Sequence, residues 1–286
     1  MISKIFNKLL RVLVRSNPID IILGRIIYGN NASFISNFRG RFLLNTNRKS
    51  NKLSTPEALQ LDIEGWLKLS ECNDLKTINS IKLKFQENIK KVEFDSSGRF
   101  DFSSINNLNF FKDFPETLSL FNNKIQKYLS DYYKNKFTIT NVHIYRILKP
   151  NDKLKNNYRL YGATASWHND GSNVDTLKVF IPLDVIGDDD GPMEFIGKSM
   201  TKKIIRNNII TFSQEKISEE IIKGDFKKML FQKEDAYIIN TNECMHRATS
   251  PNSNYRDLLV YYCASSKENF TSDWHLKATN NIYGYL

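Results

Sequence analysis

The spacing of apolar residues indicates helices in the first half of the chain. Between residues 75 and 89 the apolar positions recur at intervals of three and four, and an Asn-Asp pair just before them suits an N-cap. The pair Thr55-Pro56, followed by an acid, is typical of an earlier helix start, and a third helix is predicted from about Pro115 to Tyr133. Residues 65–69 alternate like a short strand between the first two helices.

From about residue 137 the pattern changes to a period of two, which predicts strands. We expect four of them, at Phe137 to Leu148, Thr176 to Leu183, Asp235 to Asn240 and Arg256 to Ala264. Loops rich in Asn, Asp, Gly and Pro separate them, notably residues 188–192 and 250–254. Because helices come first and strands later, without regular alternation of the two, we predict an α+β protein with a sandwich or jelly-roll arrangement of strands.

One further helix is predicted at the start of the chain, with an apolar face opposite a basic one. At about 100° per residue, the apolar face holds Ile2, Ile5, Phe6, Leu9, Leu10, Val12 and Leu13, and the basic face holds Lys4, Lys8, Arg11 and Arg15. Such a helix can pack on the protein's own body, lie in the plane of an anionic membrane surface, or bind a partner protein or nucleic acid. The sequence leaves these three interpretations open.

The charge of the chain is concentrated in its first 52 residues. The net charge is +10, from 41 basic and 31 acidic residues, and ten of the bases but only one acid, Asp20, lie in residues 1–52. The remaining 31 bases and 30 acids nearly cancel. We therefore expect a basic N-terminal extension, residues 1–52, and one domain over residues 53–286, and we do not expect a nucleic-acid partner.

Several observations favour a cytoplasmic protein. No run of 18 apolar residues occurs, so we do not expect a helix that spans a membrane. Lys8, Arg11 and Arg15 interrupt the N-terminal apolar stretch, so we do not expect a secretory signal either. Three scattered cysteines suit a reducing compartment. Peripheral contact with the inner face of a membrane, through residues 1–16, is the alternative that the basic helix raises.

The stretch Ser-Trp-His-Asn-Asp-Gly-Ser at residues 166–172 contains a candidate metal site. In an extended segment His168 and Asp170 point to the same side, and two histidines with one carboxylate form the facial triad of non-haem Fe(II) oxygenases. By itself a His-x-Asp pair is weak evidence, because it arises readily by chance. The second histidine must come from elsewhere, and His246 has the better surroundings, since it follows one predicted strand and precedes another that begins at Arg256.

Other residues with suitable chemistry are better explained by structural roles. His143 lies in an alternating strand and His275 lies near the C-terminus, so neither is expected to be a ligand. Cys244 is expected to be buried packing rather than a thiolate ligand. The acidic tract at residues 188–190 could recruit a hard cation, but a solvated turn is the simpler interpretation.

Taken together, these stretches resemble the phytanoyl-CoA dioxygenase family of Fe(II)/2-oxoglutarate oxygenases. The similar segments follow the family's order from about residue 60 to residue 264: Glu64-Gly65-Trp66-Leu67-Lys68-Leu69, Lys149-Pro150, Trp167-His168-Asn169-Asp170-Gly171, Leu177 to Asp184, Gly191-Pro192-Met193-Glu194-Phe195-Ile196, the strand at Asp235 to Asn240, His246 and Arg256. The joint order and spacing are far more specific than any single segment.

The resemblance implies a double-stranded β-helix (jelly-roll, cupin-like) over about residues 137–265, with helices packed outside. It implies that His168, Asp170 and His246 bind Fe(II), that Arg256 binds the distal carboxylate of 2-oxoglutarate, and that O2 is the second cosubstrate. Phe180 stands where members often place an aromatic residue against the cosubstrate, although a plain core role is equally open.

Some positions depart from the family's pattern. Residues 151–166 form a long polar insertion, and Glu234 replaces the glycine that usually precedes Asp235. Ala248 stands where a hydroxyl residue often helps to hold the cosubstrate, which leaves Thr249 or Tyr145 as substitutes. Related halogenases carry a small residue in the place of Asp170, so its presence favours hydroxylation.

These implications lead to the expectation of a hydroxylase that acts on a small-molecule, lipid-linked or glycan-linked metabolite and releases succinate and CO2. A different class of function is a non-catalytic β-helix protein that attaches to a membrane surface or partner through its basic N-terminal helix. A nucleic-acid oxygenase is a weaker alternative, because the basic charge is not interleaved with aromatic residues near the candidate site.

Overall fold

The computed structural model describes residues 18–28, 34–48, 53–90, 99–104, 107, 109–149, 165–170, 175–208, 213–224, 226–252 and 255–276. The basic helix predicted at residues 2–13, and the membrane contact predicted for residues 1–16, lie outside this described part. So does most of the polar insertion at residues 151–166.

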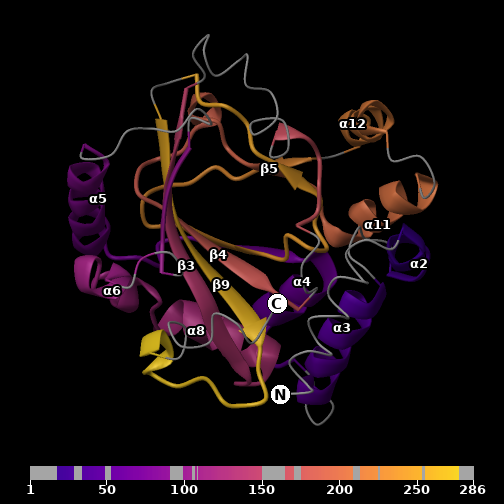
Figure 1. Cartoon of the computed structure of the whole chain (residues 1–286), viewed down its shortest axis with the longest axis horizontal. Helices are drawn as coiled ribbons and strands as arrows, with labels where there is room; N and C mark the ends of the chain where they lie inside the picture. The colour runs from indigo at the N-terminus through magenta and orange to yellow at the C-terminus, as the bar shows by residue number, and fades with distance from the viewer. Residues whose placement is uncertain are drawn as a thin grey trace.

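Six strands form the larger of two sheets, in the order β1-β7-β4-β9-β3-β2, with every neighbouring pair antiparallel. The strands are β1 (Trp66–Leu69), β2 (Arg99–Ser103), β3 (Phe137–Leu148), β4 (Leu177–Pro182), β7 (Ala236–Ile239) and β9 (Tyr255–Ser265). The two longest strands, β3 and β9, pair along their whole length (Figure 1). The four strands predicted after residue 137, and the short strand within 65–69, are confirmed to within one or two residues.

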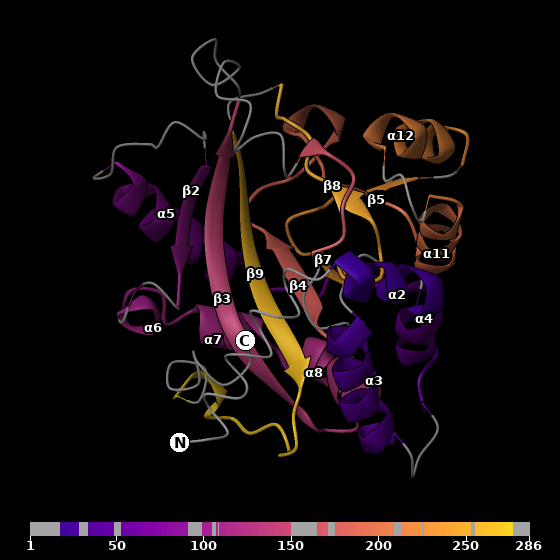
Figure 2. The ribbon, with the colours of Figure 1, turned by 45° about the vertical axis from the view of Figure 1, so that its right-hand side comes forward.

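The smaller sheet contains β5 (Glu194–Phe195), β6 (Lys227–Lys228) and β8 (His246–Arg247), again antiparallel. Figure 2 shows β5 and β8 set apart from the large sheet. Apolar side chains join the two sheets: Phe195 of β5 belongs to one buried cluster with Phe180, Tyr237 and Leu258 of the large sheet. Two facing antiparallel sheets confirm the α+β prediction and are consistent with a jelly-roll core.

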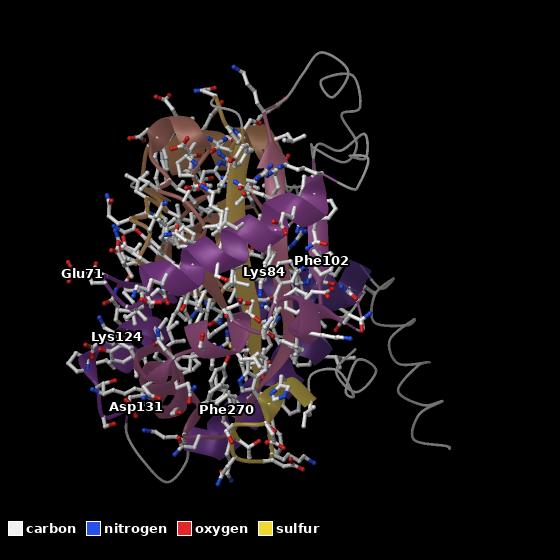
Figure 3. The ribbon with its side chains drawn as sticks, turned by 90° about the vertical axis from the view of Figure 1, so that its left-hand side faces the viewer. Glu71, Lys84, Phe102, Lys124, Asp131 and Phe270 are labelled. Carbon is white, nitrogen blue, oxygen red and sulfur yellow. The ribbon has the colours of Figure 1, made fainter. Side chains whose placement is uncertain are left out.

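Helices cover the opposite face of the large sheet. They are α4 (Pro56–Glu64), α5 (Leu75–Ile89), α6 (Phe110–Asp113), α7 (Thr117–Leu120) and α8 (Asn123–Tyr133). Their apolar residues form one cluster with the outward-facing side chains of the strands. Figure 3 looks onto this layer, with Lys84 labelled on α5 and Asp131 on α8.

The helix starts agree with the capping signals in the sequence, with one correction. Thr55 accepts a hydrogen bond from the amide of Ala58, and Asp74 accepts one from Thr77, as N-caps do. The single helix predicted from Pro115 to Tyr133 is wrong, because the chain forms α7 and then restarts as α8. Asn122 causes the restart: its backbone is extended, and its side-chain oxygen accepts from the amides of Lys124 and Ile125.

Two helices that the sequence analysis did not identify lie between strands of the smaller sheet. These are α11 (Lys198–Asn207) and α12 (Gln214–Ile222). Their isoleucines share a buried cluster with Trp167 and Met245. Each of these two residues directly precedes a histidine of the candidate site, so the helices fix the main chain around His168 and His246.

Two further helices, which were also not predicted, lie earlier in the chain: α2 (Pro18–Tyr28) and α3 (Phe34–Arg48), which contact each other. Leu44 of α3 joins the main core cluster, which anchors the pair. In the part of the chain that the structure describes, every helix is too short or too polar to cross a lipid bilayer.

Candidate functional site

His168 and His246 are neighbours through their main chains. The amide of each donates to the carbonyl of the other, and both N···O distances are 2.9 Å, so the pair forms an isolated antiparallel bridge. The ring centroids are 4.4 Å apart. On its other side His246 pairs with Phe195 of β5, which ties this bridge into the smaller sheet.

Both imidazole rings are oriented by the carbonyl two residues earlier in their own segments. Nδ1 of His168 lies 2.8 Å from the carbonyl oxygen of Ser166, and Nδ1 of His246 lies 3.1 Å from that of Cys244. A carbonyl oxygen only accepts, so each Nδ1 carries the proton and donates. Each Nε2 therefore keeps a lone pair for a metal ion, which is the usual arrangement of a histidine ligand.

Asp170 completes the group of three. Its Oδ1 lies 3.6 Å from Nε2 of His246 and 3.9 Å from Nε2 of His168. One ligand atom from each of the three residues lies within 4.8 Å of the others, and within the described ranges no other such group of His, Cys, Asp and Glu is found. The amide of Asp170 donates to the carbonyl of Thr241, which holds the carboxylate in place. The structure thus brings together the three residues predicted as ligands.

Lys178 of β4 pairs with the other oxygen of the same carboxylate. Its Nζ lies 2.6 Å from Oδ2 of Asp170 and 4.7 Å from the centre of the Tyr262 ring, and its side chain is 14% exposed. The sequence analysis missed this residue. The available signal was a lysine in the otherwise apolar strand Leu-Lys-Val-Phe-Ile-Pro, where a charge is expected only if it has a partner.

The surroundings of Asp170 and His246 favour the protonation states in which these side chains can bind a cation. Burial alone would raise the pKa of Asp170, but Lys178 and His246 more than offset burial, so this pKa lies well below its usual range. Burial lowers the pKa of His246 to about 4, against the opposing effect of Asp170. At neutral pH the site therefore offers an ionised carboxylate and a neutral imidazole.

Arg256 is buried in β9, where it lies opposite Ile147 of β3. Its Nη1 donates to the carbonyl of Thr249 at 3.5 Å, so its guanidinium reaches the segment that follows His246. Residues at alternate positions of a strand share a face. Arg256 therefore lies on the same face as Leu258 and Val260, whose side chains belong to the cluster between the sheets.

Phe180 and Tyr145 share this inner face of the large sheet. Phe180 is buried opposite Val260, and Tyr145 lies opposite Leu258. Burial raises the pKa of Tyr145, while the positive charges of Arg256, Arg99 and Lys178 oppose that rise. The contacts of Phe180 and Tyr145 with a cosubstrate stay predictions.

The structure separates the two candidates for the missing hydroxyl. The hydroxyl of Thr249 donates to the carbonyl of Pro192 at 2.6 Å, which commits its proton to the main chain. Tyr145 stays the better placed of the two, since it shares a sheet face with Arg256.

The side chains of the remaining candidates have other contacts or are buried. His143 pairs with Asp101 at 2.7 Å, and the ring of His275 packs against Phe111. Cys244 is fully buried, and burial raises the pKa of its thiol far above the usual value. In the acidic turn, Asp188 forms an ion pair with Lys228.

No family model matches the sequence, and no curated protein matches it either. Solved structures do match the fold. AviO1 from Streptomyces viridochromogenes Tue57 aligns with a TM-score of 0.53 at 12% identity, over 78% of this chain and 100% of its own. The non-heme alpha ketoglutarate dependent carbocyclase SnoK from nogalamycin biosynthesis aligns with a TM-score of 0.52 at 11% identity, over 75% of this chain and 85% of its own.

EctD from S. alaskensis, solved with bound Fe, aligns with a TM-score of 0.52 at 10% identity, over 74% of this chain and 76% of its own. At these identities the likeness concerns the fold. It shows that this chain shares the fold of these proteins, and the specific resemblance to the phytanoyl-CoA dioxygenase family stays a prediction.

Proposed function

We propose that the chain is an Fe(II)/2-oxoglutarate-dependent dioxygenase with a double-stranded β-helix core, which hydroxylates a small-molecule, lipid-linked or glycan-linked metabolite. The observation that carries the proposal is the convergence of His168, Asp170 and His246, with both Nε2 atoms free to bind a cation. Fold relatives described as iron-bound or alpha ketoglutarate dependent support the same group of enzymes.

The donor set fits Fe(II). Two neutral imidazole nitrogens and one carboxylate oxygen, all on one side of the ion, form the facial triad that non-haem Fe(II) oxygenases use. In this chain Oδ1 of Asp170 would bind the ion, while Lys178 neutralises Oδ2. The carbonyls of Ser166 and Cys244 keep both imidazoles in the tautomer that the ion requires.

The cations on the inner sheet face suit 2-oxoglutarate, which carries two carboxylates. Arg256 offers the planar, two-pronged donor that binds a carboxylate through two parallel hydrogen bonds. Its burial, at 3% exposure, strengthens such a contact because water is excluded. Tyr145 can donate a further hydrogen bond from the same face, and the ring of Phe180 would limit the space beside the cosubstrate.

When bound, the iron supplies the oxidation in which O2 and 2-oxoglutarate become CO2, succinate and one oxygen atom transferred to the substrate. The residues of this chain hold the reactants and exclude water. Among the fold relatives, SnoK is described as a carbocyclase. Hydroxylation is proposed here because Asp170 is present as a carboxylate ligand, where related halogenases have a small residue.

The test begins with binding under anaerobic conditions. Fe(II) and 2-oxoglutarate together should give a visible charge-transfer band, and His168→Ala or His246→Ala should abolish it. His143→Ala is the matched control, because His143 lies on the large sheet but outside the triad, and this variant should keep the band. A wild-type protein that shows no band and binds neither compound contradicts the proposal.

The second stage tests the reaction itself. Candidate metabolites are screened for succinate release, and the product of a positive compound should be heavier by one oxygen atom. A protein that binds iron and 2-oxoglutarate yet releases no succinate with or without metabolites supports the non-catalytic alternative. A product formed without an added oxygen atom shows that the protein is an enzyme but contradicts hydroxylation as its reaction.

A further inference from the structure

Helices α2 and α3 expose an unusual number of large apolar side chains. Of the sixteen large hydrophobic residues that are exposed in the described part of the chain, eight lie on these two helices. We name this surface the hairpin face, and its residues are Ile19, Ile22, Leu23, Ile26, Ile27, Ile35, Phe38 and Phe42. Scattered exposed apolar residues are ordinary, but a contiguous group of this kind marks an interaction surface.

The aromatic rings of the hairpin form a continuous row. Tyr28 of α2 stacks on Phe34 of α3 with ring centroids 5.8 Å apart, and Phe34, Phe38 and Phe42 follow at intervals of 6.4 Å. Phe38 is 58% exposed and Phe42 is 56% exposed. The row therefore extends the apolar surface along α3, and the outer sides of its Phe38 and Phe42 rings are exposed to solvent.

The hairpin buries polar residues and exposes apolar ones. Asp20 is 7% exposed and accepts a hydrogen bond from the amide of Ile35, and Asn37 is fully buried. In a helix that faces water the order is the reverse, since burial of apolar area stabilises the fold. The burial of Asp20 and Asn37 thus goes with an outer surface that is largely apolar.

Basic residues lie beside the hairpin face. Helix α11 contacts α2, and the two lie next to each other at the edge of the molecule (Figures 1 and 2). Lys198, Lys202 and Arg206 recur every four residues on α11 and so lie along one face of the helix, and Arg41 pairs with the same carboxylate as Lys198. We name these four residues the basic cluster.

One carboxylate faces the basic cluster. Glu243 pairs with Lys198 at 2.7 Å and with Arg41. Among the described side chains of the two helices, Arg25 adds one more positive charge, and the one acid, Asp20, is buried. The described charges of the basic cluster and of these helices are therefore mainly positive.

We propose that the hairpin face and the basic cluster bind the surface of an anionic lipid bilayer, with the helices lying in its plane. The isoleucine and phenylalanine side chains enter the boundary of the acyl region, and the lysines and arginines contact the anionic headgroups. A second copy of this chain is a poorer partner, because two basic clusters facing each other repel. A nucleic acid leaves the aliphatic residues of α2 without a partner.

Co-sedimentation with lipid vesicles tests this surface. The full chain should pellet with vesicles of phosphatidylcholine mixed with phosphatidylglycerol, and far less with phosphatidylcholine alone. The triple variant Ile26→Ser, Phe38→Ser, Phe42→Ser should lower the bound fraction by about tenfold or more, since three apolar side chains that would enter the bilayer are lost. The double variant Lys202→Gln, Arg206→Gln should weaken binding and reduce its dependence on salt.

The matched control is Leu83→Ser with Ile222→Ser, which removes exposed apolar residues from α5 and α12 and should leave lipid binding unchanged. All replaced residues except Lys202 are exposed. Circular dichroism should be used to check that each variant is folded. Three outcomes overturn the proposal: a wild-type chain that stays in the supernatant, a triple variant that binds as well as wild type, or a lipid-free wild-type dimer that the triple variant converts to a monomer. The iron-binding assay is separate, so failure here leaves the proposed function untouched.

Discussion

The ammonium group of Lys178 lies 2.6 Å from Oδ2 of Asp170, while Oδ1 of the same carboxylate lies 3.6 Å from Nε2 of His246. The two oxygens of one carboxylate thus have different partners, a lysine on one side and the histidines on the other. Oδ1 is left for a metal ion, and Lys178 compensates the charge of Asp170 before any ion binds. This partly exposed ion pair leads to the first prediction.

Replacing Lys178 with Met should destabilise the metal-free protein by about 1–3 kcal/mol at pH 7, because the carboxylate of Asp170 then loses a charge-assisted hydrogen bond. Urea unfolding in the presence of a chelator measures the change in the free energy of unfolding. In an Asp170→Asn background the same replacement should cost much less. An equal cost in both backgrounds shows that lost packing, and not the ion pair, is responsible.

The second prediction concerns Arg256 and rests on the proposed function. Arg256→Gln should raise the dissociation constant of 2-oxoglutarate by about 10- to 100-fold, because a buried charge-assisted contact with a carboxylate is lost. Affinity for the metal alone should stay unchanged. Anaerobic calorimetry with Mn(II) in place of Fe(II) measures both constants.

Arg247→Gln is the matched control for Arg256. Arg247 directly follows His246 but pairs with Glu194 at 2.6 Å. Its replacement should leave the affinity for 2-oxoglutarate close to that of wild type. If both arginine variants lose 2-oxoglutarate equally, the specific role of Arg256 is wrong.

The third prediction is a pH dependence of stability that arises at Asp131 of α8. Its carboxylate, 8% exposed, accepts hydrogen bonds from the amides and hydroxyls of Ser54 and Thr55 and pairs with Lys134 at 2.8 Å. Burial acts to raise the pKa of Asp131, but these donors outweigh it, so the pKa lies well below its usual range.

Because the pKa of Asp131 is lower in the folded than in the unfolded state, the carboxylate stabilises the fold above its unfolded pKa, at about 3.9. This contribution is lost as the pH falls further, through the folded pKa. Asp131→Asn should therefore cost about 1–3 kcal/mol at pH 7, and the difference from wild type should shrink in acid. Unfolding curves from pH 7 down to acid conditions test this, with the exposed Glu219→Gln as a variant expected to change little at any pH.

The fourth prediction concerns Gly65, which ends α4 with φ +79°. An added Cβ would lie 2.6 Å from Sγ of Cys244, and a side chain at this φ is itself unfavourable. Gly65→Ala should therefore lower the free energy of unfolding by about 1–3 kcal/mol. Adding Cys244→Ala should recover the part due to the clash, as a double-mutant cycle reports, but not the part due to the backbone.

Much of the candidate site could be predicted because its residues are defined by spacing. His168 and Asp170 belong to one extended segment, so strand alternation puts them on the same side. His246 lies between two predicted strands, and the second of these begins at Arg256. Lys178 was missed because its partner, Asp170, is close in space only after β4 and the segment at 165–170 fold together. A pattern of apolar residues does not show such a pairing.

The helices show where local patterns are insufficient. Asn122 looks like any polar position within a helix, yet its side chain caps the amides of Lys124 and Ile125 and divides the predicted helix. No helix was predicted for α2, where the structure exposes Ile19, Ile26 and Ile27 and buries Asp20. Apolar periodicity identifies the face of a helix that avoids water, and does not say what that face contacts.

The main-chain acceptors of the two histidines have a consequence for mutational robustness. The carbonyls of Ser166 and Cys244 set both tautomers, and replacing either side chain leaves those carbonyls in place. The carboxylate of Asp170 differs, because its partner is the side chain of Lys178, which a single codon change removes. Genetic drift can therefore alter the charge balance of this site far more easily than the orientation of its imidazoles.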